Sequence, residues 1–456
     1  MGPFSYSMIN ASDTRARTSA RLRQRGNTMA NQDAHQPQRS RFRLPWQLRA
    51  VNAIGGGLRS LGLPVGRLDA DALLRQAQQK TGLEDFGEPG FRPLLQTLMR
   101  SLEQEADLNT IGRISWRNQT VRHLSNRLRI QRDLTATPAI LEQTIAAPLF
   151  IVGFPRAGTT VLHNLLAQDP EARVPLLWEL RQPSPPPRSE AREPDTERSD
   201  PRIAEARDMV RQVYRRVPHL RAIHELDPTG PEECYFLFKL AFANPLIDAE
   251  VHVPTYMEAL RTLDWTVPYR LHQNALKLLQ WHIKGTHWVL KAPSHLHTLG
   301  ALLDVYPDAR VIQTHRDPRQ VAASFCSTYE ATRTLYSSSV DLARLGDDWL
   351  ASWGRAIDHM LEVRERAPAS QFHDVIYPRL LADPIAEVER IYDHFDMTVS
   401  PTMRAGMERW LREHRKGRHG AHRYQLERYG LSDARVLERF ADYVARFPTV
   451  EAASIS

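Results

Sequence analysis

The sequence predicts an α/β fold in which a central parallel sheet carries helices on both of its faces. The first observation is a short apolar run at 148–154 bounded by turn residues, as in a buried parallel strand. The second is the glycine-containing turn after it, followed by an amphipathic pattern at 159–168. The third is the return of this alternation, with strands at 288–290 and 309–314 and helices at 296–305 and 318–329. Alternation at this spacing favours parallel strands joined by right-handed crossovers.

Ahead of the sheet, the chain predicts a basic tail and then a helical region. Residues 1–45 contain many Arg, few acids and almost no apolar periodicity, which favours a disordered tail, with a transit peptide or a later start codon as alternatives. Residues 46–145 are predicted to be helical. The clearest helix lies within 68–83, where Asp69 can cap the N-terminus and Gly82 can end the helix. Its expected buried face is Leu73, Leu74 and Ala77.

The main domain is expected to span residues 146–435, with a C-terminal helix or tail at 436–456. Within this domain, residues 175–285 have a different texture: a Pro-rich, charged loop at 183–201 precedes helical patterns such as 271–283. We therefore expect a helical insertion between the first strand and the later strands. Insertions of this kind often carry the variable part of a function.

Composition limits the classes of protein to which the chain can belong. Apolar residues make up 42% of the 456 residues and charged residues 25%, as in globular proteins. No apolar run reaches the length of a membrane-spanning helix and the N-terminus has no secretory pattern, so we expect a cytoplasmic protein. The net charge of +7 is dispersed and gives no sign of nucleic-acid binding. Cys234 and Cys326 are too few and too far apart for a disulfide framework or a metal knuckle, and are expected to be buried thiols.

The turn after the first strand has the pattern of a phosphate-binding loop. Gly153 and Gly158 are five residues apart between a strand and a helix, and Thr159 and Thr160 follow at the helix start. Glycines let the backbone wrap around an anion, and the helix N-terminus offers unpaired N–H donors. Thr159 stands where such loops usually carry Lys, and Arg156 supplies the positive charge.

A nucleotide kinase is the first alternative, and two features disfavour it. The loop lacks the usual Lys, and the strand at 311–314 ends in His315 and Arg316 rather than in an acid that could hold Mg²⁺. Asp317 precedes Pro318 and is predicted to be a helix cap. We expect no metal site, and a donor whose transferred group carries less negative charge than a γ-phosphate.

With its G-F-P-R-x-G-T-T loop the sequence resembles the sulfotransferase superfamily, in its bacterial branch. The resemblance implies a fold of the P-loop nucleotide-kinase-like type, with residues 146–435 as the catalytic domain and 175–285 on the acceptor side. It also implies a co-substrate, 3'-phosphoadenosine-5'-phosphosulfate (PAPS). The loop residues expected to bind its 5'-phosphosulfate are Arg156, Ala157, Gly158, Thr159 and Thr160.

Two further motifs extend the resemblance to about residues 60–435. Arg316 is followed eight residues later by Ser324, and an R-K-G-x-x-G pattern begins at Arg415. In the family both motifs hold the 3'-phosphate, so the resemblance assigns that role to Arg316, Ser324, Arg415, Lys416 and Gly417. Arg316 and Ser324 can also be expected to converge on physical grounds, because one ends a strand and the other lies two turns into the next helix.

Sulfuryl transfer requires cations at the leaving oxygen and a base at the acceptor. Arg156 is one candidate cation. Lys291, at the end of the strand 288–290 and before Ala292-Pro293, is the other, and in the family a lysine in this setting reaches the bridging oxygen. Four residues remain open as the base, in this order of preference: Glu179, His224, His295 and Glu233.

The sequence thus predicts a sulfotransferase that moves a sulfuryl group from PAPS to an acceptor hydroxyl or amine. The alternatives are a P-loop kinase and a non-catalytic nucleotide or anion sensor. Aromatic and aliphatic residues are frequent in the insertion, so the acceptor could be an apolar small molecule such as a lipid, sterol or phenol, although such residues are more often core. The oligomeric state is left open.

Overall fold

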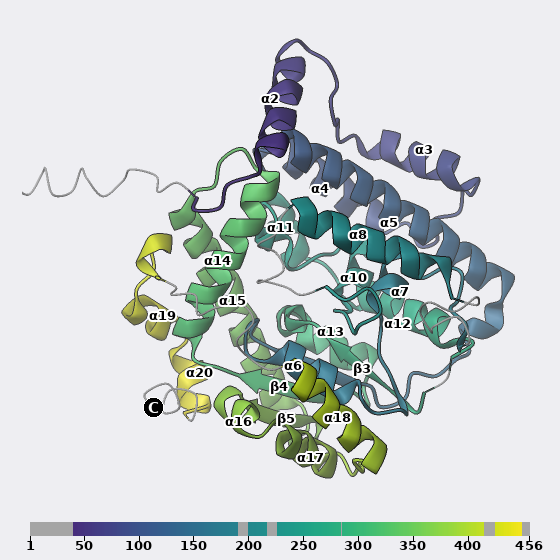
Figure 1. Ribbon diagram of the computed structural model, residues 1–456, viewed down its shortest axis with the longest axis vertical. Coiled ribbons are helices and arrows are strands. Elements are labelled where there is room, and N and C mark those ends of the chain that lie inside the picture. The colour runs from purple at the N-terminus through teal and green to yellow at the C-terminus, as the bar shows by residue number, and fades with distance from the viewer. Residues whose placement is uncertain (1–39, 190–198, 217–225, 284, 415–424, 449–456) are drawn as a thin grey trace, which may run out of the picture. The chain divides into compact units, whose positions relative to one another are not determined.

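The computed structural model describes residues 40–189, 199–216, 226–283, 285–414 and 425–448 (Figure 1). Most of the predicted basic tail lies outside these ranges. Residues 40–45, which the tail prediction included, contact α14 (Pro318–Tyr336), because the Arg41 amide donates to Glu330 Oε1 over 2.7 Å. None of the described helices is long and apolar enough to cross a membrane.

Five parallel strands form the central sheet, in the order β2-β3-β1-β4-β5. The strands are β1 (Leu149–Gly153), β2 (Ala172–Arg173), β3 (His287–Lys291), β4 (Arg310–His315) and β5 (Phe372–Ile376). Every residue of β1 is buried, which explains its continuous apolar run. The predicted strands within β1, β3 and β4 are confirmed, whereas β2 and β5 were not predicted.

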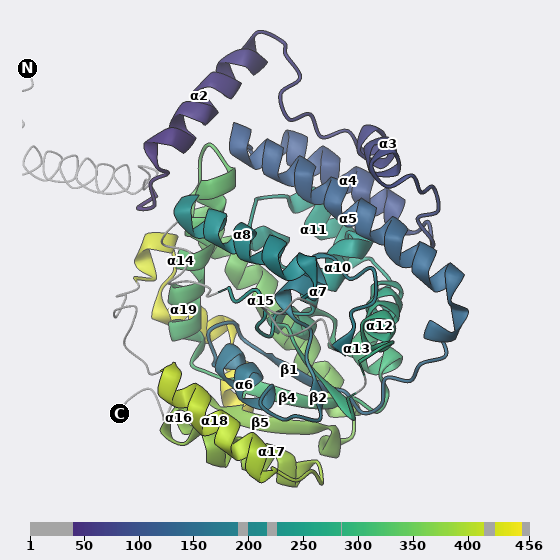
Figure 2. The ribbon, with the colours of Figure 1, turned by 45° about the vertical axis from the view of Figure 1, so that its right-hand side comes forward.

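Helices cover both faces of the sheet, as predicted, because successive side chains of β1 point to opposite sides. Leu149 and Ile151 pack with α6 (Thr159–Leu166), α17 (Pro384–His394) and α18 (Pro401–Glu413). Phe150 and Val152 belong to the core on the other face, with α14 and with α12 (Thr266–Gln280), α13 (Leu299–Val305) and α15 (Leu342–Arg366). Figures 1 and 2 show these two layers on either side of the strands.

The region before the sheet is helical, as predicted, and has its own core. It contains α2 (Trp46–Ser60), α3 (Ala70–Thr81), α4 (Phe91–Gln104), α5 (Thr110–Ala136) and the 3₁₀ turn η2 (Pro138–Ile140). The predicted caps of α3 are confirmed: the Asp69 carboxylate accepts from the Ala72 amide over 2.8 Å, and Gly82 adopts a φ of 69°. Its predicted apolar face, Leu73, Leu74 and Ala77, is buried.

The insertion between β2 and β3 is mostly helical. It comprises α7 (Leu177–Arg181), α8 (Pro201–Arg216), α10 (Tyr235–Phe238), η4 (Lys239–Ala241), η5 (Ile247–Ala249), α11 (Pro254–Arg261) and α12 (Thr266–Gln280). The helix predicted at 271–283 is α12, which begins five residues earlier and ends three residues earlier.

After β3, one predicted helix needs correction. Residues 293–298 form a 3₁₀ turn, η6 (Pro293–Thr298), and the α-helix α13 (Leu299–Val305) starts only at Leu299. The His295 amide bonds to the Ala292 carbonyl, the tighter spacing of a 3₁₀ turn. The remaining elements are α15 (Leu342–Arg366), η7 (Ala369–Gln371), α16 (Tyr377–Ala382), η8 (Glu427–Tyr429), α19 (Asp433–Arg439) and α20 (Ala441–Arg446).

Candidate active site

The glycines of the predicted phosphate loop are required by the backbone. Gly153 ends β1 with a φ of 132°, and a Cβ there would lie 2.3 Å from Thr314 Oγ1. Gly158 precedes α6 with a φ of 89°, and a Cβ there would lie 2.8 Å from Leu380 Cδ2. Both positions therefore exclude other residues. Between them the chain turns so that α6 begins at Thr159 and its first amide groups face the end of the sheet, where an anion can bind.

Within this loop, side chains differ in exposure. Arg156 has a φ of 67° and is exposed, Ala157 and Thr159 are buried, and Thr160 is exposed. The buried Thr159 is part of the helix start, whereas the exposed Arg156 and Thr160 side chains can reach a bound molecule. Arg156 therefore supplies a cation without the lysine that phosphate loops usually carry.

The structure brings the first two motifs together. The guanidinium of Arg316, which follows β4, donates from Nη1 to the carbonyl oxygen of Arg156 over 2.5 Å. Its Nε and Nη2 donate to Gln320 Oε1 over 3.2 and 3.1 Å, and the guanidinium lies 4.3 Å from the centre of the Tyr377 ring. Ser324 lies further along α14 and is buried. The Asp317 carboxylate accepts from the Arg319 amide over 2.9 Å, which confirms the predicted helix cap.

Gln320 and Tyr377 were missed by the sequence interpretation. Gln320 lies four residues after Arg316, and this spacing was the available signal for a contact in the first helical turn. Tyr377 begins α16, directly after β5, and could not be placed because β5 was not predicted.

Lys291 ends β3 beside Ile151 of β1, and its side chain is only 2% exposed. Its Nζ donates to Glu233 Oε1 over 2.6 Å, and the Glu233 side chain is 14% exposed. A backbone bond fixes the same neighbourhood, because the Cys234 amide donates to the Lys291 carbonyl over 3.0 Å. A lysine and a carboxylate are thus held together at the carboxyl end of the sheet, next to the phosphate loop.

Lys291 and the loop helix open onto one cleft with a volume of about 830 Å³. Thr160 and Asn164 of α6 line it, together with Lys291 and Glu232. Apolar side chains, among them Val174, Leu176 and Leu226, also line it. The cleft further includes Trp410 and His414, and His414 immediately precedes the third motif.

Glu179, the first candidate for the base, lies in a buried ion pair. Its two carboxylate oxygens each accept from Arg173 Nη2 over 2.9 Å, and Oε2 also accepts from the Leu176 amide over 3.1 Å. Both side chains are buried, and Arg173 stacks over the ring of Trp288. These contacts cap α7 and attach it to β3, so the geometry favours a structural role for Glu179.

His295 is also enclosed. Its Nδ1 hydrogen-bonds with the Tyr269 hydroxyl over 2.7 Å and its Nε2 with Cys234 Sγ over 3.1 Å. Burial among Phe150 and Phe238 lowers the pKa of His295 well below its ordinary value. Because both ring nitrogens are engaged inside the core, the geometry favours a packing role rather than proton transfer.

The remaining predicted residues lie outside the described part of the chain. These are His224, the second candidate for the base, and the third motif, Arg415, Lys416 and Gly417. Among the described residues, no group of three or more His, Cys, Asp or Glu side chains is placed as metal ligands would be.

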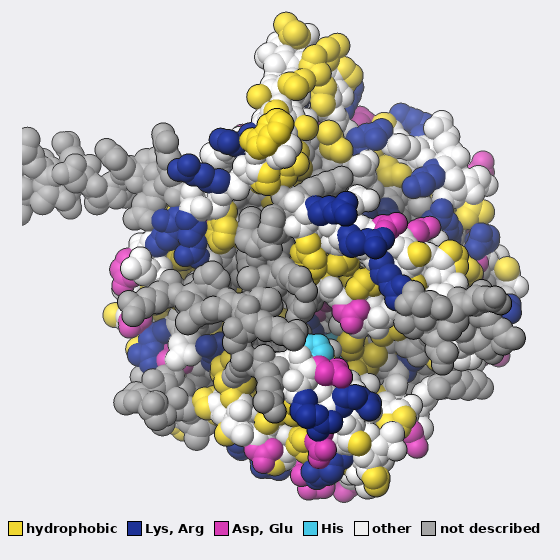
Figure 3. Space-filling model, in the orientation of Figure 1, with side chains coloured by type: hydrophobic (Ala, Val, Ile, Leu, Met, Phe, Trp, Pro, Cys, Tyr) yellow, Lys and Arg dark blue, Asp and Glu magenta, His cyan; other side chains and the backbone are white. Residues whose placement is uncertain are grey.

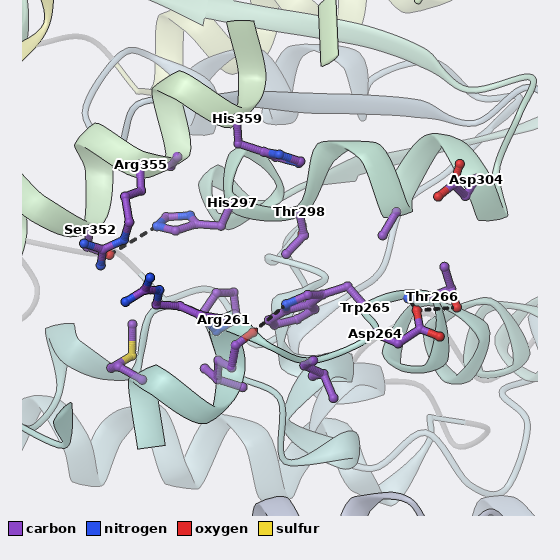
Figure 4. A pocket seen from close by; sticks show the side chains of 16 residues that line it. Arg261, Asp264, Trp265, Thr266, His297, Thr298, Asp304, Ser352, Arg355 and His359 are labelled. Atoms are coloured by element: carbon purple, nitrogen blue, oxygen red, sulfur yellow. Dashed lines mark hydrogen bonds between the residues drawn. The ribbon is translucent and has the colours of Figure 1, made fainter. Parts of the chain in front are cut away.

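A second cavity, of about 440 Å³, shares no lining residue with the cleft at Lys291 (Figure 4). Arg261, Arg355 and Ser352 lie toward one end and Asp264, Thr266 and Asp304 toward the other. His297 Nε2 hydrogen-bonds with Ser352 Oγ over 3.3 Å. None of the sequence-predicted site residues lines this cavity, so we place the candidate active site in the cleft at Lys291.

A parallel sheet with a glycine-containing loop at a helix N-terminus, a paired lysine and a second arginine at the loop is the arrangement expected of a transferase. Residues 148–401, more than half of the chain, match the model of the Sulfotransferase family. The chain belongs to this family, as its motifs predicted, and it is a sulfotransferase.

Solved structures are similar over most of the chain. The sulfotransferase STF1 of Mycobacterium tuberculosis is 33% identical with a TM-score of 0.75, and the match covers 83% of this chain and 100% of that one. The sulfotransferase STF9 of Mycobacterium avium is 28% identical with a TM-score of 0.77, over 83% of this chain and 96% of that one. The predicted P-loop-like α/β fold is confirmed by these neighbours.

A curated relative is named for its substrate. Omega-hydroxy-beta-dihydromenaquinone-9 sulfotransferase Stf3 of Mycobacterium bovis is 23% identical over 319 residues, which cover 68% of this chain and 77% of the relative.

Proposed function

We propose that this sulfotransferase uses PAPS as its donor and transfers the sulfuryl group to a hydroxyl, or an amine, of an apolar small molecule. The observation that carries this proposal is the bond from Arg316 to the carbonyl of Arg156. It joins the phosphate loop to the Arg316 and Ser324 motif. Two anion-binding elements side by side match a donor that carries phosphate on both its 5' and its 3' positions.

For the donor, each element has a separate task. The amide groups at the start of α6, the Thr160 hydroxyl and Arg156 bind the 5'-phosphosulfate. Arg316 and Ser324 bind the 3'-phosphate, and Arg415, Lys416 and Gly417, which lie outside the described residues, are proposed as further ligands of it. Gln320 and Tyr377 orient the Arg316 guanidinium from two sides, since one bonds to it and the other stacks against it.

For the chemistry, Lys291 is the proposed electrostatic catalyst. When the acceptor oxygen attacks sulfur in line, the bond between sulfur and the bridging oxygen breaks and negative charge grows on the leaving phosphate. An ammonium group with little exposure stabilises that charge more than one in bulk water would. The products are the sulfated acceptor and adenosine 3',5'-bisphosphate.

For the base, we propose Glu233 in place of Glu179 and His295. Its carboxylate is partly exposed and lies at Lys291, where the acceptor must approach, whereas Glu179 and His295 are enclosed by bonding partners. Glu233 would take the proton of the acceptor hydroxyl as the new bond to sulfur forms. His224 stays an alternative, outside the described residues.

For the acceptor, two observations support an apolar molecule. The cleft at Lys291 has apolar side chains, among them Val174, Leu176 and Leu226, beside its charged ones. The relative Stf3 is named for a dihydromenaquinone bearing an omega-hydroxyl group. For the location, we propose the cytoplasm, a reducing compartment with which the two free thiols Cys234 and Cys326 are compatible.

The experiment is a screen for transfer from labelled PAPS to terminal hydroxyls of prenylated quinols, sterols and phenols, with hydrophilic sugars and amines as comparison. We expect labelled product from at least one apolar hydroxyl, dependent on PAPS and not on ATP. Product formation from sugars alone would contradict the apolar acceptor. Transfer of phosphate from ATP would contradict the assignment of PAPS as the donor.

A further inference from the structure

Helix α2 is attached to the protein by its polar side. Asn52 Oδ1 accepts from the Ile111 amide over 3.0 Å, and Arg59 Nη1 donates to Thr110 Oγ1 over 2.9 Å. Gly55 lies so close to α5 that a Cβ would come within 2.3 Å of Thr110. The side of α2 that faces the domain thus carries a polar amide, a glycine and an arginine beside the half-buried Leu48, and is less apolar than the opposite side.

Four of the five large apolar side chains of α2 are exposed to solvent. Trp46 is 68% exposed and Ile54 66%, and Leu61, just past the helix end, is 78% exposed. Six of the nine large hydrophobic side chains that are exposed in the described residues lie between 46 and 63. At 100° per residue, Trp46, Ile54, Leu58 and Val51 share an arc of about 140°. Figure 3 shows hydrophobic side chains gathered over α2.

On its own, this helix is poorly stabilised. It contains three consecutive glycines, Gly55 to Gly57, each of which costs a helix interior roughly 1 kcal/mol relative to alanine. Only Gly55 of the three has a packing reason, since a Cβ on Gly56 or Gly57 would meet nothing within 4 Å. An exposed apolar face on such a helix indicates an external surface that covers it.

The positive charge around α2 indicates that the surface covering it is negatively charged. Residues 40–68 contain five Arg and no Asp or Glu. Arg43 and Arg49 flank Trp46 and are both exposed. A face of Trp, Ile and Leu bordered by arginines is the pattern of helices that lie in the interface of a membrane with anionic lipids.

We propose that α2 docks this enzyme on an anionic membrane surface, with Trp46, Ile54, Leu58 and Leu61 inserted among the lipids. The helix lies in the interface and does not cross it. Membrane docking itself does not depend on the identity of the acceptor. Its purpose rests on the proposed function: docking brings the cleft to acceptors dissolved in the bilayer.

The test is cosedimentation of the full-length protein with vesicles of phosphatidylcholine alone or with 30% phosphatidylglycerol. We expect binding to the anionic vesicles, and a loss of at least about tenfold in partitioning for Ile54→Asp, since the inserted face gains a charge. The matched control is Leu141→Asp, which adds the same charge at an exposed apolar residue outside α2 and should bind as the wild type does.

Two results would overturn the proposal. Unchanged vesicle binding by Ile54→Asp would mean that the protein binds lipid without inserting the apolar face of α2. A wild-type dimer in size-exclusion chromatography that Ile54→Asp converts to a monomer, without vesicle binding by either, would assign the face to a second copy of the chain. Binding of adenosine 3',5'-bisphosphate, measured in parallel, should be unchanged in Ile54→Asp, so a failure of docking and a failure of the proposed donor site are seen separately.

Discussion

The ammonium group of Lys291 donates to Glu233 Oε1 over 2.6 Å at the carboxyl end of β3, beside the phosphate loop. The two side chains have little exposure and hold each other at the place where we propose that the acceptor and the leaving oxygen meet. Because the Cys234 amide also bonds to the Lys291 carbonyl, the backbone keeps this pair in register. Substitution of each member separates the two roles.

Lys291→Ala should lower the turnover number by roughly 10²- to 10³-fold, as for the loss of one group that stabilises a developing charge. The donor's Michaelis constant should change much less, because the lysine acts mainly in the transition state. Steady-state kinetics with PAPS varied at one fixed acceptor concentration measure both quantities. A large rise in the Michaelis constant with unchanged turnover would make Lys291 a docking residue.

Glu233→Gln should lower turnover by roughly 10²- to 10⁴-fold, the contribution of a positioned general base, while donor binding persists. Glu179→Gln is the contrasting variant. This substitution leaves the buried guanidinium of Arg173 with a neutral, weaker partner. Breaking such a buried ion pair outright costs about 3–5 kcal/mol of folding free energy.

Thermal unfolding and kinetics together compare these two glutamate variants. We expect Glu179→Gln to melt at a lower temperature and to keep substantial turnover per folded molecule. The reverse pattern, with a stable but inactive Glu179→Gln and an active Glu233→Gln, would return the role of base to Glu179.

Acidification should destabilise the protein below about pH 6.5. Burial lowers the pKa of His272 to about 3, and its Nδ1 hydrogen-bonds with the Tyr306 hydroxyl over 2.8 Å. A group whose pKa is depressed in the folded state contributes stability above its unfolded pKa and loses it as the pH falls. The loss by pH 5 is up to about 2 kcal/mol for this histidine.

The matched measurement is the melting temperature of wild type and His272→Gln between pH 8 and pH 5. The wild type should lose stability over this range with a steeper slope than the variant, which has one buried imidazole fewer to protonate. Equal slopes would mean that His272 does not contribute. The buried His163, whose pKa burial lowers to about 3, should add to the same slope in both proteins.

The sheet and the loop were predictable because their signals are local. An apolar run, two glycines with obligatory backbone angles and a capped helix at Asp317 are each specified within a few residues. The edge strand β5 was missed because only Phe372 and Val375 of its five residues are buried and it carries His373 and Asp374 between them. Because β5 was not predicted, the position of Tyr377, directly after it, could not be predicted either.

The role of Glu233 was ranked last among the candidate bases for a related reason. Nothing near it in sequence indicates Lys291, which is 58 residues away and is brought to it by the fold. Glu179 ranked first by its place after the loop helix, but its environment depends on Arg173 and β3. Tertiary packing decides which carboxylate stays partly exposed beside Lys291 and which is buried against Arg173.

We propose that the loop and Arg316 together bind a nucleotide with a 3'-phosphate. Isothermal titration of adenosine 3',5'-bisphosphate and of adenosine 5'-monophosphate tests it most directly, without knowledge of the acceptor. The wild type should prefer the bisphosphate by roughly 10- to 100-fold, and Arg316→Ala should lose most of that preference because it removes a charge-assisted contact. The control Arg319→Ala, whose guanidinium bonds to Asp317, should keep the preference. Equal affinity of the wild type for the two nucleotides would contradict the assignment.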